Sequence, residues 1–124
     1  MAAVSVPRFE RAVERFGERL LARLFLPGEL DYARRRRNGT ESLAVRLAAK
    51  WAAREALLPL GLGRVPVRQL EVVRRRGEAP TLRALGTVAP AVDGLRFSVS
   101  LTHDREIAMA AVWLERGHAS LSRP

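Results

Sequence analysis

An alanine-rich stretch in the middle of the chain constrains the fold more than any other segment. Residues Arg46 to Gly63 read RLAAKWAAREALLPLGLG, and neither glycine nor proline interrupts them before Pro59. Alanine, leucine and long unbranched side chains are the strongest helix formers. The stretch therefore predicts a long helix ended by Pro59, Gly61 and Gly63, with a thin alanine surface that another element can approach closely.

Charged side chains on this helix allow two interpretations. Arg46, Lys50 and Arg54 recur at four-residue spacing, so they share one helix face, and Glu55 follows at the edge of that face. A carboxylate beside a row of cations suits a site that holds a divalent metal together with a polyphosphate. The alternative is a solvated basic stripe on an otherwise buried helix, because a charge run is usually a solvated face.

The remaining segments predict strands at both ends of the chain, with helices between them. The first half predicts a strand at 3–6, an amphipathic helix at 7–25 that Gly17 interrupts, and a short helix at 29–36. The second half predicts strands at 70–75 and 81–85 around a turn, at 97–102, where apolar and polar residues alternate, and at 107–114, a mostly apolar run. This order predicts an α+β fold, in which an antiparallel sheet packs on one long helix and on shorter helices. We expect a single domain over residues 1–116 and a disordered tail over 117–124.

Composition limits the class of protein and its partners. The chain has 124 residues, no cysteine and a formal net charge of +9. A chain of this length forms one domain, and the lack of cysteine excludes a disulfide framework or a thiolate metal site. No apolar run reaches the length of a membrane span and no leader pattern opens the chain, so we expect a cytoplasmic protein without a membrane partner.

The positive charge favours anionic partners: acidic proteins, anionic cofactors or nucleic acid. Four consecutive arginines, Arg34 to Arg37, end the predicted short helix. They either compensate the helix dipole or form a phosphate-binding patch. A nucleic-acid-binding protein is disfavoured, because the few aromatic residues suit a core and no RNA- or DNA-binding motif is present.

Three motifs carry a resemblance to a known family. WAAREA, Trp51 to Ala56, resembles the WAAKEA or FAAKEA signature of the holo-(acyl-carrier-protein) synthases, the small bacterial 4'-phosphopantetheinyl transferases. SLTHDREIAMAAV, Ser100 to Val112, resembles the family's C-terminal segment, and VSVPRFERA, Val4 to Ala12, resembles its opening. The motifs stand in family order and at family spacing, and the likeness covers nearly the whole chain.

The resemblance implies the 4'-phosphopantetheinyl transferase fold and transfer of 4'-phosphopantetheine from coenzyme A to a serine of apo acyl carrier protein. The products are holo acyl carrier protein and 3',5'-ADP, in support of fatty acid biosynthesis. It also implies Mg²⁺ as the cofactor and a homotrimer with active sites between subunits. Phosphoryl chemistry of this kind needs charge neutralisation, alignment and a base for the hydroxyl proton.

Family roles fall on particular residues of this chain. Glu55 matches the metal-ligand glutamate, and His103 matches a histidine near the pantetheine and pyrophosphate. Lys50 matches a cation that contacts the nucleotide phosphates, and Arg54 matches the lysine of WAAKEA. The backbone of the turn from Gly77 to Pro80 matches one that lies along the adenine. Arg8 and Arg19 match positions on the helix that docks the acidic carrier protein.

Two positions depart from the family pattern. The aspartate that shares the metal with the glutamate falls at Ala2, and a lysine that contacts the pyrophosphate falls at Pro59. Loss of a metal ligand and of a pyrophosphate cation weakens transition-state stabilisation. The alternative function is therefore a catalytically impaired relative that binds coenzyme A or acidic carrier proteins without turnover.

Overall fold

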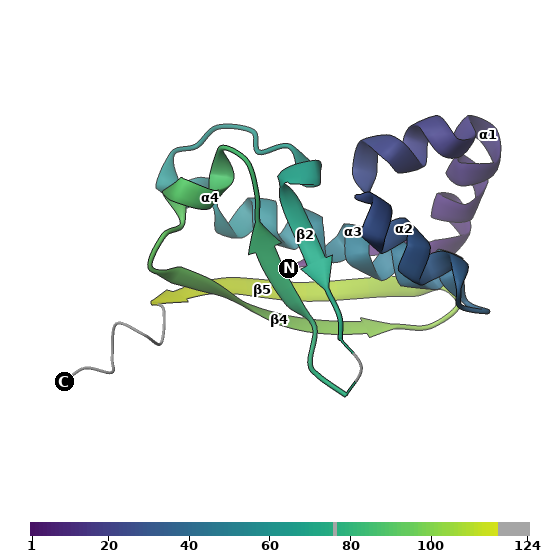
Figure 1. Cartoon of the computed structure of the whole chain (residues 1–124). Coiled ribbons are helices and arrows are strands. Elements are labelled where there is room, and N and C mark those ends of the chain that lie inside the picture. The colour runs from purple at the N-terminus through teal and green to yellow at the C-terminus, as the bar shows by residue number, and fades with distance from the viewer. Residues whose placement is uncertain (76, 117–124) are drawn as a thin grey trace.

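A computed structural model describes residues 1–75 and 77–116, and Figure 1 shows its elements arranged around one long helix. In chain order these are β1 (Ala2–Ser5), α1 (Val6–Leu24), α2 (Pro27–Arg34), α3 (Gly39–Ala56), two 3-10 turns (Leu58–Leu60 and Val67–Gln69), β2 (Leu70–Val73), β3 (Thr81–Ala84), α4 (Val88–Ala91), β4 (Leu95–His103) and β5 (Ile107–Arg116). The predicted tail at 117–124 lies outside the described residues. No helix in the described ranges is long and apolar enough to cross a membrane.

Helix α3 is the centre of the core. It begins at Gly39, earlier than the alanine-rich stretch itself, and ends at Ala56, shortly before Pro59. Its alanines at 44, 48, 49 and 53 have no exposed surface. Strands β5, β1 and β4 pack against it, together with α1 and α2. The prediction of a long helix with a thin surface is therefore confirmed.

The strands form two antiparallel sheets rather than the single sheet that the sequence predicted. One has the order β1–β5–β4, with Ala2 and Leu101 both opposite Ala110, and the other pairs β2 with β3. Between the two sheets the chain passes from β3 through α4 into β4. Figure 1 shows the β2–β3 pair crossing the long β4–β5 ribbon. The α+β class with antiparallel pairing is confirmed.

Gly17 divides α1 into two arms. Its φ of 63° and ψ of −146° lie outside the helical region, in a conformation that residues with a β-carbon rarely adopt. The helix also begins as the sequence suggests, because the Ser5 hydroxyl accepts a hydrogen bond from the Arg8 N–H at 3.3 Å and Pro7 occupies the first turn. The two arms of α1 and α2 group at one end of α3 (Figure 1).

A buried ion pair joins α2, α3 and β2. Lys50 Nζ lies 2.6 Å from Glu29 Oε1, and both side chains are almost fully covered. Glu29 also accepts hydrogen bonds from the N–H groups of Leu26 and Val72, each at 2.9 Å, and Lys50 donates to the Leu24 carbonyl at 2.8 Å. Burial lowers the pKa of the Lys50 ammonium, and the Glu29 carboxylate opposes that shift. Every charge in this pair therefore has hydrogen-bond partners.

This pair corrects the interpretation of the Arg46–Lys50–Arg54 face as a solvated stripe. Arg46 and Lys50 are buried, and only Arg54 is partly exposed. The face points toward α2 and β2, where Glu29 supplies the compensating charge. Helical spacing identified the shared face but not the element that covers it.

We expect Lys50→Met to lower the free energy of unfolding by about 3–5 kcal/mol, because it leaves the Glu29 carboxylate buried without its cation. Urea unfolding followed by circular dichroism measures this loss. The matched control is Arg83→Gln, which breaks an exposed pair with Glu71 and should cost less than about 1 kcal/mol. Equal unfolding midpoints for Lys50→Met and the parent would show that the pair does not stabilise the fold.

Candidate functional site

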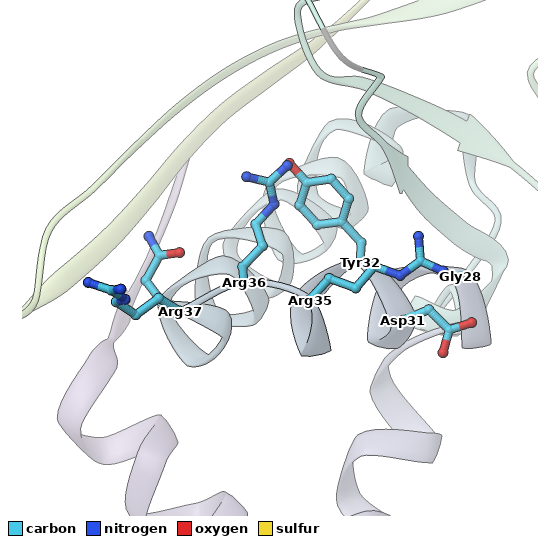
Figure 2. A pocket seen from close by; sticks show the side chains of 7 residues that line it. Gly28, Asp31, Tyr32, Arg35, Arg36 and Arg37 are labelled. Atoms are coloured by element: carbon cyan, nitrogen blue, oxygen red, sulfur yellow. The ribbon is translucent and has the colours of Figure 1, made fainter.

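A cleft of about 560 Å³ opens between the loop before α3, the first half of α3 and the turn after β2. Basic and polar side chains dominate its wall: Arg36, Arg46, Arg74, Arg75 and His103, with Tyr32, Asn38, Ser42, Val45, Gly77 and Glu78. A second hollow of about 680 Å³ adjoins it and shares three residues with it, Tyr32, Arg36 and Asn38 (Figure 2). Guanidinium groups bind phosphate with forked hydrogen bonds, so this cleft suits a phosphate-bearing ligand.

The Tyr32 ring is the platform of the cleft. The guanidinium carbons of Arg36 and Arg46 lie 4.2 Å and 4.3 Å from its centroid, within the range of cation–π attraction. Figure 2 shows Tyr32 and Arg36 on the same side of the backbone, whereas Arg35 and Arg37 point away from them. The ring therefore holds two like charges close together and directs them toward the cleft.

His103 stands at the end of β4, where a tight turn fixes its backbone. Asp104 forms that turn, because its Oδ1 accepts the N–H groups of Glu106 at 2.7 Å and Ile107 at 2.9 Å. These two hydrogen bonds, that from Ile107 first, hold the pKa of Asp104 below its usual value. His103 Nδ1 lies 3.2 Å from Glu41 Oε1 in the first turn of α3. The structure thus places His103 in the cleft, beside the predicted Gly77 turn.

Glu55 lies on a different part of the surface. Its side chain is 59% exposed, and its Oε1 is 3.3 Å from the Met1 ammonium. Ala2, where the resemblance places a second carboxylate, is the next residue after Met1, whose ammonium contacts Glu55. Among the described residues, no group of three or more His, Cys, Asp or Glu side chains is placed to bind a metal. An exposed single carboxylate suits a Mg²⁺ that keeps waters and takes other ligands from substrate phosphates.

The structure separates the two residues expected to carry the chemistry. Glu55 follows Glu41 by fourteen residues on α3, which is about 21 Å at about 1.5 Å per residue. Because His103 contacts Glu41, it lies near one end of α3 and Glu55 lies at the other. Within one chain, Glu55 and His103 cannot act on the same pyrophosphate.

The other expected residues occupy varied surroundings. Lys50 is inside the core and has no exposed surface, so its ammonium is not on the wall of the cleft. Arg54 donates Nε–H to the Val65 carbonyl at 3.0 Å, and burial followed by the charge of Arg64 lowers its pKa. Pro80 ends the turn that begins at Gly77 and is partly covered. The two docking candidates on α1, Arg8 and Arg19, are both exposed, one on each arm.

Sequence reasoning missed most of the cleft. Tyr32 and the pair Arg74–Arg75 were not among the expected ligand-binding residues. Spacing did place Arg46 on one cationic face with Lys50 and Arg54, and of these three residues Arg46 alone lines the cleft. The arginines at 74 and 75 end the strand predicted at 70–75, and in the structure they directly follow β2, which ends at Val73.

Comparisons with known proteins agree on one family. The model of the 4'-phosphopantetheinyl transferase superfamily matches residues 3–112. The holo-[acyl-carrier-protein] synthase of Koribacter versatilis is 37% identical over 115 residues, which cover 90% of this chain and 92% of that protein. The enzyme of the same name from Methylobacterium sp. is 42% identical over 118 residues, with coverage of 89% and 87%.

Solved structures give the same result for the fold. An acyl carrier protein synthase of Mycobacterium tuberculosis has a TM-score of 0.71 at 31% identity, and 92% of each chain is covered. A complex of the Helicobacter pylori holo-[acyl-carrier-protein] synthase with coenzyme A has a TM-score of 0.76 at 26% identity, with coverage of 92% and 96%. The predicted fold class and the resemblance found in the motifs are confirmed.

Proposed function

The chain belongs to the 4'-phosphopantetheinyl transferase superfamily, and from this we propose that it transfers 4'-phosphopantetheine from coenzyme A to a serine of apo acyl carrier protein. The family match over residues 3–112 carries this proposal. The products are holo acyl carrier protein and 3',5'-ADP, and the reaction supports fatty acid biosynthesis. The proposed unit is one domain over residues 1–116, and the proposed location is the cytoplasm.

Coenzyme A binds in the arginine-lined cleft beside His103 and the Gly77–Pro80 turn. The four arginines of the cleft face one acidic lining residue, Glu78, so the cavity attracts a polyanion. Synthases of known structure with coenzyme A bound share this fold. In this proposal the cleft arginines, rather than Lys50, contact the nucleotide phosphates. Lys50 supports the cleft indirectly, through its hydrogen bond to Glu29.

Glu55 is the proposed Mg²⁺ ligand, and Arg54 beside it is a candidate phosphate contact. The Glu55 carboxylate is exposed, so a hydrated Mg²⁺ can reach it. Substrate phosphates would supply further ligands to such an ion. When bound, the ion neutralises charge that builds on the pyrophosphate during transfer. The carrier serine hydroxyl attacks the β-phosphorus, its proton leaves to a base, and the bond to 3',5'-ADP breaks. His103 is the proposed base, because its Nδ1 faces Glu41 and leaves Nε2 for the substrate.

The separation of Glu55 from His103 supports a homotrimer with active sites between subunits. A site that needs both groups must take His103 from one copy and Glu55 from the next, since about 21 Å separates them along α3. Strand β5 offers surface for such contacts. Ile107, Met109 and Trp113 are 47%, 36% and 49% exposed, while the alternating residues Ala108, Ala110 and Val112 are buried.

The partner surface is α1, with Arg8 and Arg19 as the proposed contacts to the acidic carrier protein. Both side chains are exposed, and Arg19 shares a surface hollow with Arg15, Phe16 and Arg23. Opposite charges steer association and set orientation. Phe16, which is 57% exposed, adds an apolar contact at the bend made by Gly17.

A specific observation favours a second candidate, a binder of coenzyme A or carrier proteins that does not turn over. Ala2 and Pro59 replace a carboxylate and a cation that the family pattern supplies. The cleft and the α1 surface do not depend on either residue. Turnover of apo acyl carrier protein with coenzyme A and Mg²⁺ separates the two candidates.

We expect Glu55→Gln to lower kcat by at least about 100-fold while helix content and melting temperature stay unchanged, because the exposed side chain contributes charge rather than packing. Ala2→Asp should raise kcat and lower the Mg²⁺ concentration needed for half-maximal rate. Phosphopantetheinylation of carrier protein measured by mass spectrometry at several Mg²⁺ concentrations checks both. Ala2→Asp should raise kcat only when Glu55 is present. If it raises kcat equally in the parent and in the Glu55→Gln variant, the two carboxylates do not share one ion.

Mixing two inactive variants tests the shared site. Glu55→Gln and His103→Ala each retain the group that the other lacks, so randomly mixed trimers should recover about one quarter of the parental sites. The assay is turnover after the variants are unfolded and refolded together, with each variant refolded alone as the control. Persistent inactivity of mixtures that form trimers by light scattering would place both groups in one chain.

A further inference from the structure

A pair of arginines, Arg54 and Arg64, lies near the end of α3 that carries Glu55. Arg54 precedes Glu55 on the helix, and its Nε–H donates to the Val65 carbonyl at 3.0 Å. That hydrogen bond joins α3 to the loop that follows it, and Arg64 is the residue directly before Val65. Because the bond uses the Nε–H, the terminal nitrogens of Arg54 can still donate to a ligand.

The positive charges of these two side chains are not compensated. Among the residues that the structure describes, neither takes part in an ion pair, whereas the exposed Arg34 and Arg83 each contact a carboxylate. Burial, followed by the nearby charge of Arg64, lowers the pKa of Arg54. Two cations held close together repel each other, and an anion that contacts both relieves the repulsion. The pair therefore suits a ligand with strong negative charge.

The backbone of the loop fixes Arg64 at the surface. Gly63 has a φ of 74°, which lets the chain turn immediately before Arg64. Val65 is only 3% exposed, so it anchors the next position of the loop in the core. Arg64 itself is exposed. Its side chain therefore starts from a fixed backbone position, while its guanidinium is open to a ligand.

Glu55 indicates which anion fits. Its carboxylate is exposed at the same end of α3 and is the proposed Mg²⁺ ligand. An anion that contacts a metal and two guanidinium groups together needs several phosphate oxygens, as a pyrophosphate has. Pro59, where the family pattern supplies a pyrophosphate cation, carries no charge. Arg54 and Arg64 can supply the positive charge that Pro59 lacks.

We propose that Arg64 is a further catalytic residue, which holds the pyrophosphate of coenzyme A together with Arg54 and so replaces the cation missing at Pro59. The inference rests on the proposed function and adds to it a residue that contacts the reacting group. When the bond from the β-phosphorus breaks, its electron pair goes to the oxygen of 3',5'-ADP. The two guanidinium groups stabilise this charge and keep their protons, because arginine does not deprotonate in proteins.

Calorimetric titration in the presence of a chelator tests the contact without metal or turnover. Arg64→Gln should bind coenzyme A roughly 10- to 100-fold more weakly than the parent, the loss expected for one charge-assisted contact. Adenosine 3'-phosphate, the nucleotide part of coenzyme A without its pyrophosphate, should bind the variant and the parent equally. Because Arg64 is exposed, the melting temperature should not change. Parental affinity of Arg64→Gln for coenzyme A would overturn the role of Arg64.

Matched variants separate a local contact from a general effect of charge. Arg96→Gln removes the same charge from β4, where Arg96 lies 3.9 Å from Glu115, and it should keep the parental affinity for coenzyme A. An equal loss of affinity in Arg96→Gln would show that only net charge matters. Arg64→Lys should lose less than about fivefold, because the ammonium keeps the positive charge without the forked donors.

Turnover of apo acyl carrier protein with Mg²⁺ distinguishes this inference from the proposed function. Arg64→Gln should lower kcat roughly 10- to 100-fold and leave the KM for carrier protein unchanged. A variant that raises only the KM for carrier protein would show that the loop contacts the carrier instead of the pyrophosphate. If the parent transfers phosphopantetheine and Arg64→Gln does so at the parental rate, only the role of Arg64 fails. If the parent neither binds coenzyme A nor modifies the carrier, the proposed function itself fails.

Discussion

The buried pair of Lys50 and Glu29 is the interaction on which the geometry of the cleft depends. It connects α3 to α2, and through the Val72 N–H it also connects both helices to β2. Tyr32 follows Glu29 by three residues on α2, and Arg46 precedes Lys50 by four on α3, so the pair sets the distance between the platform and the guanidinium that lies on it. The strand it holds leads directly to Arg74 and Arg75. A buried ion pair is seldom a net source of stability, and its value here is that it allows one relative position of three elements.

Much of the secondary structure was predictable, because helix propensity, strand patterns and glycine positions act over short stretches of sequence. Alanine and leucine content predicted α3, strand-like runs between turns predicted four strands of the second half, and Gly17 marked the bend in α1. Glu55, His103 and the Gly77 turn came from motifs, and the family to which those motifs point is confirmed. Their roles in catalysis and binding stay predictions.

The rest depended on contacts between distant parts of the chain. Spacing placed Arg46, Lys50 and Arg54 on one face, but only the packing of α2 against that face showed that two of the three are buried. The partner of Lys50 is twenty-one residues away and that of His103 is sixty-two residues away, so no local pattern reveals either. For the same reason the division of the strands into two sheets was not predictable, since it includes the pairing of β1 with β5 from the two ends of the described chain.

The alanine surface of α3 also bears on how this chain can vary. Ala44, Ala48, Ala49 and Ala53 have no exposed surface in a helix that neighbouring strands and helices pack against. A larger side chain there meets a filled space and forces the backbone apart, at a typical cost of about 1–3 kcal/mol. Such displacement would also move Arg46 and Glu55, which project from the same helix. Over evolutionary time, these small side chains should be among the slowest positions to diverge, although none of them contacts a ligand. Substitution rates at these alanines would then report on active-site alignment as much as on stability.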